Sequence, residues 1–348
     1  MRILILGNNY SAKSFYNFFT KNKENIVFST IRGYQGFIDF VDDSDIVDFC
    51  EANDINFVLI IDEQYINSGL QEQISSLEIS AFSPTSEAIG ICASKACAKR
   101  FMYKNKIKTP KFQIIEKPQM AFDYVKSSTY PKAIKPDNSS YQEGVKFFET
   151  YSQAQNLIND YFRSGNKKIL IEDYIEGKNF TVWTLSDGYS AKIISICAKY
   201  QNEVALFNPS FVDENLINEI QNNFINPTLK ALNVQEEEYI GILGFNFILT
   251  PNKELFLINY NSFFDDICVD FHTKGFEIDW LDVFESTLVG DIFTKHDFKN
   301  HKNFMLTLRQ KDKIKLISAN TKTGLNIYLE ELDYDLSYYK EAQKIWKY

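Results

Sequence analysis

Short hydrophobic runs alternate with helical patterns through roughly the first 80 residues of the chain. Apolar runs of strand length occur at 2–6, 25–30 and 57–61, and helix-like spacing of apolar residues occurs at 12–20, 46–52 and 70–77. Strands separated by helices predict right-handed βαβ units and a parallel sheet. The turn at 7–12 lacks the G-x-G-x-x-G pattern, so it gives no support for a dinucleotide site.

After residue 86 the pattern predicts a mixture of helices and strands. One helix is expected over 86–104, before Pro110, and 111–171 follows as strand, helix, strand, loop, strand, helix and strand. Antiparallel strands are expected within 180–199 and 241–261, helices over 214–232 and 280–288, strands at 303–308, 313–318 and 325–329, and a helical tail. The fold class expected from these patterns combines α/β and α+β parts.

Composition and charge exclude several classes of protein. The 348 residues carry 37 Lys and Arg against 46 Asp and Glu, a net charge of −9, which argues against general nucleic-acid binding. No apolar run approaches the ~20 residues of a membrane-spanning helix, and the first residues enter a strand pattern without a signal-peptide core, so we expect a cytoplasmic protein without a membrane partner. Five dispersed cysteines lack a C-x-x-C pair, and three histidines occur late in the chain. A disulfide framework, a zinc site and a His-based triad are therefore not indicated.

Two lysines occur where a phosphate could bind. Lys95 lies early on the helix expected over 86–104, and Lys135 ends an apolar strand beside the polar loop 137–145. A lysine ammonium is a compact charge on a long stem, which suits a phosphate ligand. Taken alone, each lysine is more often a solvated surface charge than a phosphate ligand.

Acidic and amide side chains follow in two later segments. Glu172 and Asp173 end a strand, where they could contact a ribose or belong to a solvated turn. Asn246 and the pair Asn259 and Asn261 fall on the two strands of an expected hairpin, and residues two apart on a strand share a face. These amides could be ligands or hydrogen-bonding groups of the core.

Four motifs carry a resemblance to a known family. The chain reads F-S-P-T at 82–85, S-K-A-C-A-K-R-F-M at 94–102, I-E-D-Y-I-E-G at 171–177 and I-N-Y-N at 258–261. In type and order these resemble the ATP-grasp superfamily, nearest to glycinamide ribonucleotide synthetase (phosphoribosylamine–glycine ligase), over roughly 1–290.

The resemblance implies a domain plan. An N-terminal, Rossmann-like, parallel-sheet pre-ATP-grasp domain would precede a two-subdomain ATP-grasp fold. The expected parts are the N-terminal domain at 1–86, a connecting helix at 87–110, the small lid subdomain at 111–178, the large subdomain at 179–300 and a short C-terminal segment at 301–348.

The resemblance also implies an ATP site. Lys95 and Lys135 would contact the phosphates, Glu172 would accept from the adenine amino group, the backbone of Asp173, Tyr174 and Ile175 would read the base edge, and Asn179 would stand at the ribose. The loop 137–144 would be the lid, although Gly144 is its one glycine.

The implied metal and substrate positions depart from the family pattern. Two carboxylates that hold Mg²⁺ in the family are replaced by Asn246 and Asn259, whereas Asn261 keeps its identity, and Asp265 or Asp266 could supply a carboxylate. Mg²⁺ prefers anionic oxygen ligands, so the amides weaken this implied site. Glu63 is the one implied substrate residue that survives, and no catalytic residue is assigned.

Two functions remain open on these motifs. The first is an ADP-forming, ATP-dependent ligase that joins a small-molecule carboxylate to an amine through an acyl-phosphate, and a homodimer is an assembly it could form. The alternative is a catalytically impaired nucleotide-binding protein with a binding or scaffold role.

Overall fold

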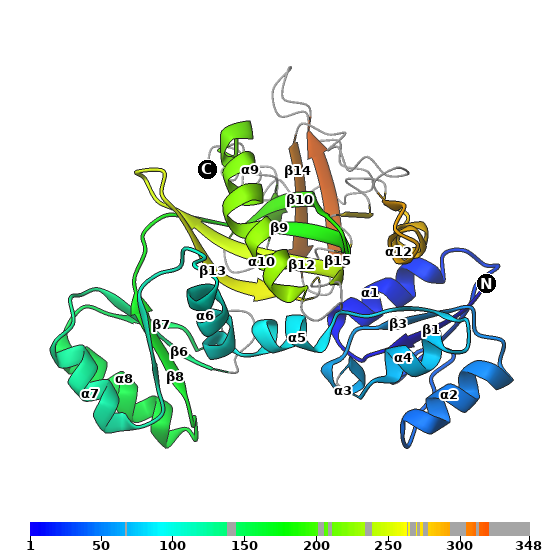
Figure 1. Cartoon of the computed structure of the whole chain (residues 1–348), viewed down its shortest axis with the longest axis horizontal. Coiled ribbons are helices and arrows are strands. Elements are labelled where there is room, and N and C mark those ends of the chain that lie inside the picture. Colours follow the sequence, from blue (N-terminus) through cyan, green and yellow to red (C-terminus); the bar gives the residue numbers. More distant parts are fainter. Residues whose placement is uncertain are drawn as a thin grey trace.

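The computed structural model describes most of the chain in three sheets. The described residues are 1–66, 68–137, 144–200, 205–207, 211–233, 239–262, 264, 269, 272–273, 278–292, 304–310 and 313–319. Figure 1 shows the N-terminal domain at one end, a small subdomain at the other, and a larger sheet between and above them. Within these residues, no helix has both the length and the apolar character needed to cross a membrane.

The N-terminal domain confirms the expected parallel sheet. Its strands are β1 (Arg2–Leu6), β2 (Ile26–Ser29), β3 (Phe57–Ile60) and β4 (Ser80–Phe82), in the order β2-β1-β3-β4, with helices α1 (Tyr10–Phe19), α2 (Asp43–Ala52), α3 (Glu63–Ile66) and α4 (Leu70–Ser75). The sheet is buried on both faces, as parallel sheets usually are. Ile3 packs with Phe15 of α1 on one face, and Leu4 packs with Ile46 of α2 on the other.

The single helix expected over 86–104 is wrong. The structure has two helices, α5 (Ser86–Ala93) and α6 (Lys95–Lys104), separated at Ser94. Ser94 is extended, with φ −116° and ψ 117°, and its side chain accepts a hydrogen bond from the backbone N–H of Cys97. Ser94 is therefore the N-cap of a new helix, a position that serine favours.

The small subdomain follows the expected strand and helix order. Its strands are β5 (Phe112–Ile115), β6 (Lys132–Pro136), β7 (Lys146–Phe148) and β8 (Ile169–Asp173), in the antiparallel order β5-β8-β6-β7, with helices α7 (Pro118–Lys126) and α8 (Tyr151–Arg163). Both helices cover one face of this sheet (Figure 1), where Ile134 and Ile171 join their apolar core. Because side chains alternate along a strand, Lys135 and Glu172 lie on the opposite face.

The large subdomain is built on a seven-stranded antiparallel sheet. Its strands are β9 (Lys178–Asp187), β10 (Ala191–Tyr200), β11 (Ala205–Phe207), β12 (Ile240–Leu249), β13 (Leu255–Asn261), β14 (Phe304–Gln310) and β15 (Lys313–Ala319), in the order β13-β12-β9-β10-β11-β14-β15. The last two strands confirm the strands expected near 303–308 and 313–318, and they extend this sheet. The strand expected at 325–329 and the helical tail lie outside the described residues.

Helices complete the large subdomain. The helix expected over 214–232 is present as α9 (Glu214–Ile220), the π-helical turn η1 (Gln221–Ile225) and α10 (Asn226–Leu232), and the helix expected over 280–288 is α12 (Trp280–Leu288). Phe284 of α12 packs against Phe82 of the N-terminal domain, with ring centroids 4.3 Å apart. An aromatic core thus joins the N-terminal domain to the central sheet.

Candidate functional site

Three lysines surround one buried carboxylate. Lys135 of β6 donates a hydrogen bond to Glu172 Oε1, and Lys99 Nζ of α6 lies 2.9 Å from Glu172 Oε2. Lys95, one helical turn before Lys99, lies within electrostatic reach of Lys135, Glu172 and Asp137. Two lysines predicted from separate segments and the predicted hinge glutamate therefore come together in one cluster.

Strand register places Lys135 and Glu172 on the same face of the small sheet. Ala133 of β6 pairs directly with Glu172 of β8, and Lys135 lies two residues beyond Ala133. Helix α6 contacts β8 and also contacts β13 of the large subdomain, so it lies between the two subdomains (Figure 1). Lys99 thus reaches Glu172 from α6, whereas Lys135 reaches it from the small sheet itself.

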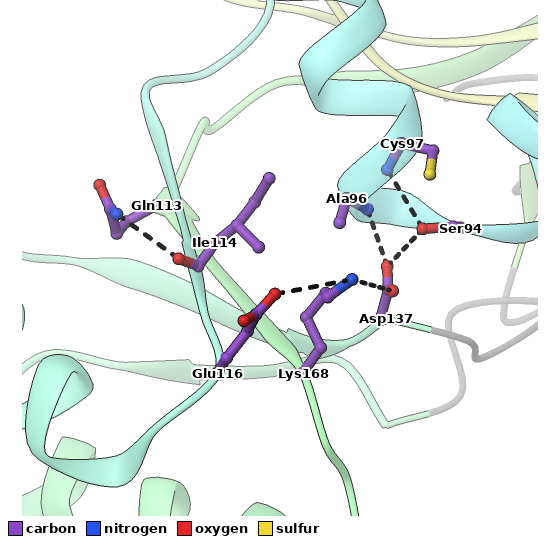
Figure 2. A network of polar contacts seen from close by, with 8 residues as sticks. All are labelled: Ser94, Ala96, Cys97, Gln113, Ile114, Glu116, Asp137 and Lys168. Atoms are coloured by element: carbon purple, nitrogen blue, oxygen red, sulfur yellow. Dashed lines mark hydrogen bonds and ion pairs between the residues drawn. The ribbon is translucent and has the colours of Figure 1, made fainter.

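Asp137 holds the end of β6 against the first turn of α6. Its Oδ1 accepts hydrogen bonds from the Ser94 hydroxyl at 2.9 Å and from the Ala96 N–H at 2.8 Å (Figure 2). Its backbone oxygen accepts a hydrogen bond from the Lys95 N–H at 3.2 Å. Lys168 lies 3.8 Å from Asp137 Oδ2. Asp137 is two residues from Lys135, so this contact explains why the two predicted lysines converge.

The other end of the predicted lid is also held. The Tyr161 hydroxyl of α8 donates to the backbone oxygen of Gly144 and lies 3.4 Å from the backbone oxygen of Ile134. Burial raises the pKa of Tyr161 to about 12. Gly144 has φ +72°, which favours glycine. Of the lid predicted at 137–144, residues 138–143 lie outside the described residues.

Burial and neighbouring charges perturb the ionisation of the cluster. Burial, with the nearby Lys135 charge, lowers the pKa of Lys95 to about 8. Burial also lowers the pKa of Lys99 to about 8 against the attraction of Glu172. For Glu172, burial raises the pKa, but the Lys135 and Lys99 charges outweigh it and lower the pKa to about 2. The ammonium groups of Lys95, Lys99 and Lys135 face two carboxylates, those of Glu172 and Asp137. The excess positive charge favours an anionic ligand.

Lys99 was not predicted as a site residue. It is 1% exposed, and its ammonium also donates to the Thr109 hydroxyl at 2.5 Å. Its signal was the spacing of four residues from Lys95, because residues four apart share a helix face. Nothing in the sequence indicates that this ammonium is buried.

The predicted hinge residues lie beside the cluster but on different elements. Asp173 forms an ion pair with Lys132, Nζ to Oδ1 2.5 Å, and the Tyr174 N–H donates to the Pro131 oxygen at 3.3 Å, extending the ladder between β6 and β8. Ile175 is half-buried, and Asn179 is exposed on β9 of the other sheet. The structure gives each residue a position, and the base and ribose roles stay predictions.

The three predicted metal positions form an amide set on the neighbouring hairpin. Asn246 of β12 and Asn259 of β13 are direct cross-strand partners, and Asn261 pairs with Gly244. Asn246 Oδ1 accepts a hydrogen bond from the Thr181 hydroxyl at 2.6 Å. No group of three His, Cys, Asp or Glu side chains suited to a metal occurs in the described part of the chain. The three amides carry no negative charge, whereas Mg²⁺ prefers anionic oxygen ligands.

For three further predicted residues the structure describes no side-chain contacts. Asp265 and Asp266 lie outside the described residues. Glu63 begins α3 just beyond the end of β3, and its side chain lies outside the description. Their metal and substrate roles stay predictions.

Comparison with known sequences finds similarity to phosphoribosylamine–glycine ligases. Residues 93–269 match the family model of the phosphoribosylglycinamide synthetase ATP-grasp (A) domain. The phosphoribosylamine–glycine ligase of Clostridium acetobutylicum is 24% identical over 235 residues, covering 62% of this chain and 56% of the relative. That of Fusobacterium nucleatum subsp. nucleatum is 25% identical over 299 residues, covering 80% of this chain and 66% of the relative. The chain therefore spans less than two thirds of the length of either relative.

Solved structures agree on the fold. The phosphoribosylamine–glycine ligase of Thermotoga maritima superposes with a TM-score of 0.69 at 16% identity, covering 93% of this chain and 82% of that chain. The N5-carboxyaminoimidazole synthetase of Staphylococcus aureus, solved with ADP, gives a TM-score of 0.67 at 12% identity, covering 89% and 82%. The ATP-grasp fold expected from the motifs is confirmed.

Proposed function

Because the chain belongs to the phosphoribosylglycinamide synthetase ATP-grasp domain family, we propose that it is an ATP-dependent ligase that joins a small-molecule carboxylate to an amine. The observation that carries this proposal is the convergence of Lys95, Lys135 and Glu172. All three fall within the matched residues 93–269, and Lys95 and Lys135 are 40 residues apart in the sequence. Such a cluster gives a nucleotide both cations and a carboxylate acceptor.

The nucleotide would bind with its phosphates at the lysines and its base at Glu172. Lys135 and Lys95 would take phosphate oxygens through charge-assisted hydrogen bonds, which are the stronger kind. Glu172 stays ionised, because its pKa is lowered to about 2 by the two lysines against the effect of burial, so it acts as an acceptor. That state suits the exocyclic amino group of adenine.

The chemistry would then proceed by phosphoryl transfer. The substrate carboxylate oxygen attacks the γ-phosphorus of ATP, and the bond to the β-phosphate oxygen breaks to give an acyl-phosphate and ADP. The amine then attacks the acyl carbon and phosphate leaves. The ammonium groups of Lys95 and Lys135 would balance negative charge on the phosphates during transfer.

One observation favours a second function, nucleotide binding without turnover. The amide set of Asn246, Asn259 and Asn261 does not fit Mg²⁺, and Asn246 Oδ1 already accepts the Thr181 hydroxyl. Loss of metal carboxylates removes charge stabilisation from the transferring phosphoryl group. Binding through the lysines would survive this change.

Thermal denaturation with ATP tests nucleotide binding. We expect ATP to raise the melting temperature of the wild-type chain, and Lys135→Ala to abolish the rise. Lys108→Ala is the matched control, because the Lys108 side chain is exposed and its ammonium pairs with Glu254 at 3.0 Å, not with a member of the cluster. Absence of a shift with any nucleotide contradicts both functions.

Phosphate release separates the two functions. A ligase releases phosphate only when ATP, an acid and an amine are all present, so panels of small acids and amines are assayed together with ATP. ATP binding without release under any combination supports the second function.

A further inference from the structure

The Glu172 carboxylate is shared between two lysines, one at each oxygen. Lys135 donates a hydrogen bond to Oε1, and the Lys99 ammonium lies 2.9 Å from Oε2. All three side chains are buried, because Glu172 is 3% exposed, Lys99 1% and Lys135 8%. A buried carboxylate needs a cation beside it, and either lysine alone supplies one. Glu172 therefore has one cation more than its own charge requires.

The two lysines are held in different ways. The Lys99 ammonium also donates to the Thr109 hydroxyl at 2.5 Å, and its helix α6 packs against β13 as well as β8. Lys135 comes from β6 and lies two residues before Asp137, the first residue of the predicted lid. Lys99 is thus anchored in the interior, whereas Lys135 lies at the strand end where the proposed function places the phosphates.

Phosphate binding requires Lys135 to change its partner. An ammonium that donates to a phosphate oxygen gives up at least part of its bond to Glu172. A buried carboxylate without a cation beside it is strongly unfavourable, so a Glu172 that had only Lys135 would compete with the phosphate for that ammonium. Lys99 removes this competition, because it stays beside Oε2 when Lys135 leaves Oε1.

Resting on the proposed function, we propose that Lys99 is a positioning residue that acts as the permanent counter-ion of Glu172 and so releases Lys135 for the phosphates of the nucleotide. Lys99 makes no phosphate contact of its own in this role, since its ammonium is buried against Glu172 and Thr109. The role is exerted through Glu172 and disappears without it. This dependence distinguishes a counter-ion from a cation that simply attracts the phosphates.

A double-mutant cycle with inorganic tripolyphosphate tests the dependence, because this probe carries phosphates and no base. In titration calorimetry, Lys99→Met should weaken tripolyphosphate binding about tenfold in the wild-type background and less than about threefold in the Glu172→Gln background, where Lys135 is already released. Lys99→Met keeps the pair of Lys135 and Glu172, and circular dichroism verifies that each variant is folded. Lys104→Met is the matched control, because Lys104 is an exposed lysine in the last turn of the same helix.

The pH dependence of binding gives a second readout that leaves Glu172 unchanged. Lys135 and Lys99 are the charges that lower the pKa of Glu172. Without Lys99, the release of Lys135 leaves the buried carboxylate with no ammonium in contact, so it takes up a proton as tripolyphosphate binds. The affinity of Lys99→Met should therefore rise more steeply than that of the wild type as the pH falls from about 7 to 5. Tripolyphosphate titrates identically in both measurements, and Lys95, with a pKa of about 8, stays charged over this range.

The outcomes are distinct. Equal weakening of tripolyphosphate binding in both backgrounds overturns the counter-ion role, because Lys99 then acts directly on the phosphates. Unchanged affinity in Lys99→Met, or parallel pH profiles of this variant and the wild type, also overturns it. Each of these results leaves the proposed function standing. A wild-type protein that binds neither ATP nor tripolyphosphate overturns the proposed function and the counter-ion role together.

Discussion

Replacement of Glu172 by glutamine should destabilise the protein in a way that depends on pH. Glu172 is 3% exposed and contacts the ammonium groups of Lys135 and Lys99. Glutamine keeps the shape and removes the charge. Two buried ammonium groups then lose their anionic partner, and breaking a buried ion pair typically costs ~3–5 kcal/mol.

The lowered pKa of Glu172 gives a second value for the free energy that its charge contributes to stability. Burial opposes ionisation, but Lys135 and Lys99 lower the pKa of Glu172 from 4.5 to about 2. A carboxyl group shifted that far contributes on the order of 3 kcal/mol to stability at neutral pH. Because the folded-state pKa is the lower one, this contribution is complete above about pH 4.5 and is lost as the pH falls toward 2.

Urea denaturation followed by far-ultraviolet circular dichroism measures the effect at pH 7, 5 and 3. We expect Glu172→Gln to be less stable than the wild type by about 3 kcal/mol at pH 7 and pH 5, and the gap to narrow at pH 3. Glu254→Gln is the control: its side chain is 58% exposed and pairs with Lys108, so the change should stay below about 1 kcal/mol. Equal stability of Glu172→Gln and wild type at pH 7, or a gap that does not vary with pH, would refute the reasoning.

Three other changes probe the cluster. Ser94→Ala removes the N-cap of α6 and the hydroxyl bonded to Asp137, so it should lower the free energy of unfolding by about 1 kcal/mol and also weaken ATP binding in titration calorimetry. Thr150→Ala, which removes the N-cap of α8, should lower the free energy of unfolding by a similar amount and leave ATP affinity unchanged. Burial and Lys135 lower the pKa of Lys95 to about 8, so this lysine loses its charge as the pH rises from 7 to 9 and ATP affinity should fall. Lys95→Arg keeps its charge over this range and should flatten the dependence of affinity on pH. A wild-type affinity that is constant from pH 7 to 9 contradicts the role of Lys95. Asn246→Asp with Asn259→Glu restores two carboxylates, so Mg²⁺ should then increase the thermal shift produced by ATP, and no gain with Mg²⁺ would show that these two positions alone do not set metal binding.

The spacing of apolar residues predicted most of the fold, because that spacing follows directly from which face of each helix or strand is buried. The buried strands β1 and β3 are continuous apolar runs, and the small subdomain follows the expected order of strands and helices. The break at Ser94 escaped prediction, since the residues on both sides favour a helix and the decisive partner, Asp137, lies 43 residues away. A tertiary contact there overrides local propensity.

The site was predictable in its charges and not in their pairing. Motif positions predicted Lys95, Lys135 and Glu172 as members of the candidate site, whereas the burial of Lys99 depends on how α6 packs against β8. The amides at Asn246 and Asn259 were visible in the sequence, but the hydrogen bond from Thr181 needed the register of β9 and β12. Registry between distant strands is a property of the assembled sheet.

The described residues at the two ends of the predicted lid, Asp137 and Gly144, are attached to different helices. One end is fixed to α6 through Asp137, and the other is fixed to α8 through the Tyr161 hydroxyl. Any displacement of one helix relative to the other changes the span between these supports. Substitutions in the packing of α6 or α8 can therefore alter the predicted lid without touching its own sequence.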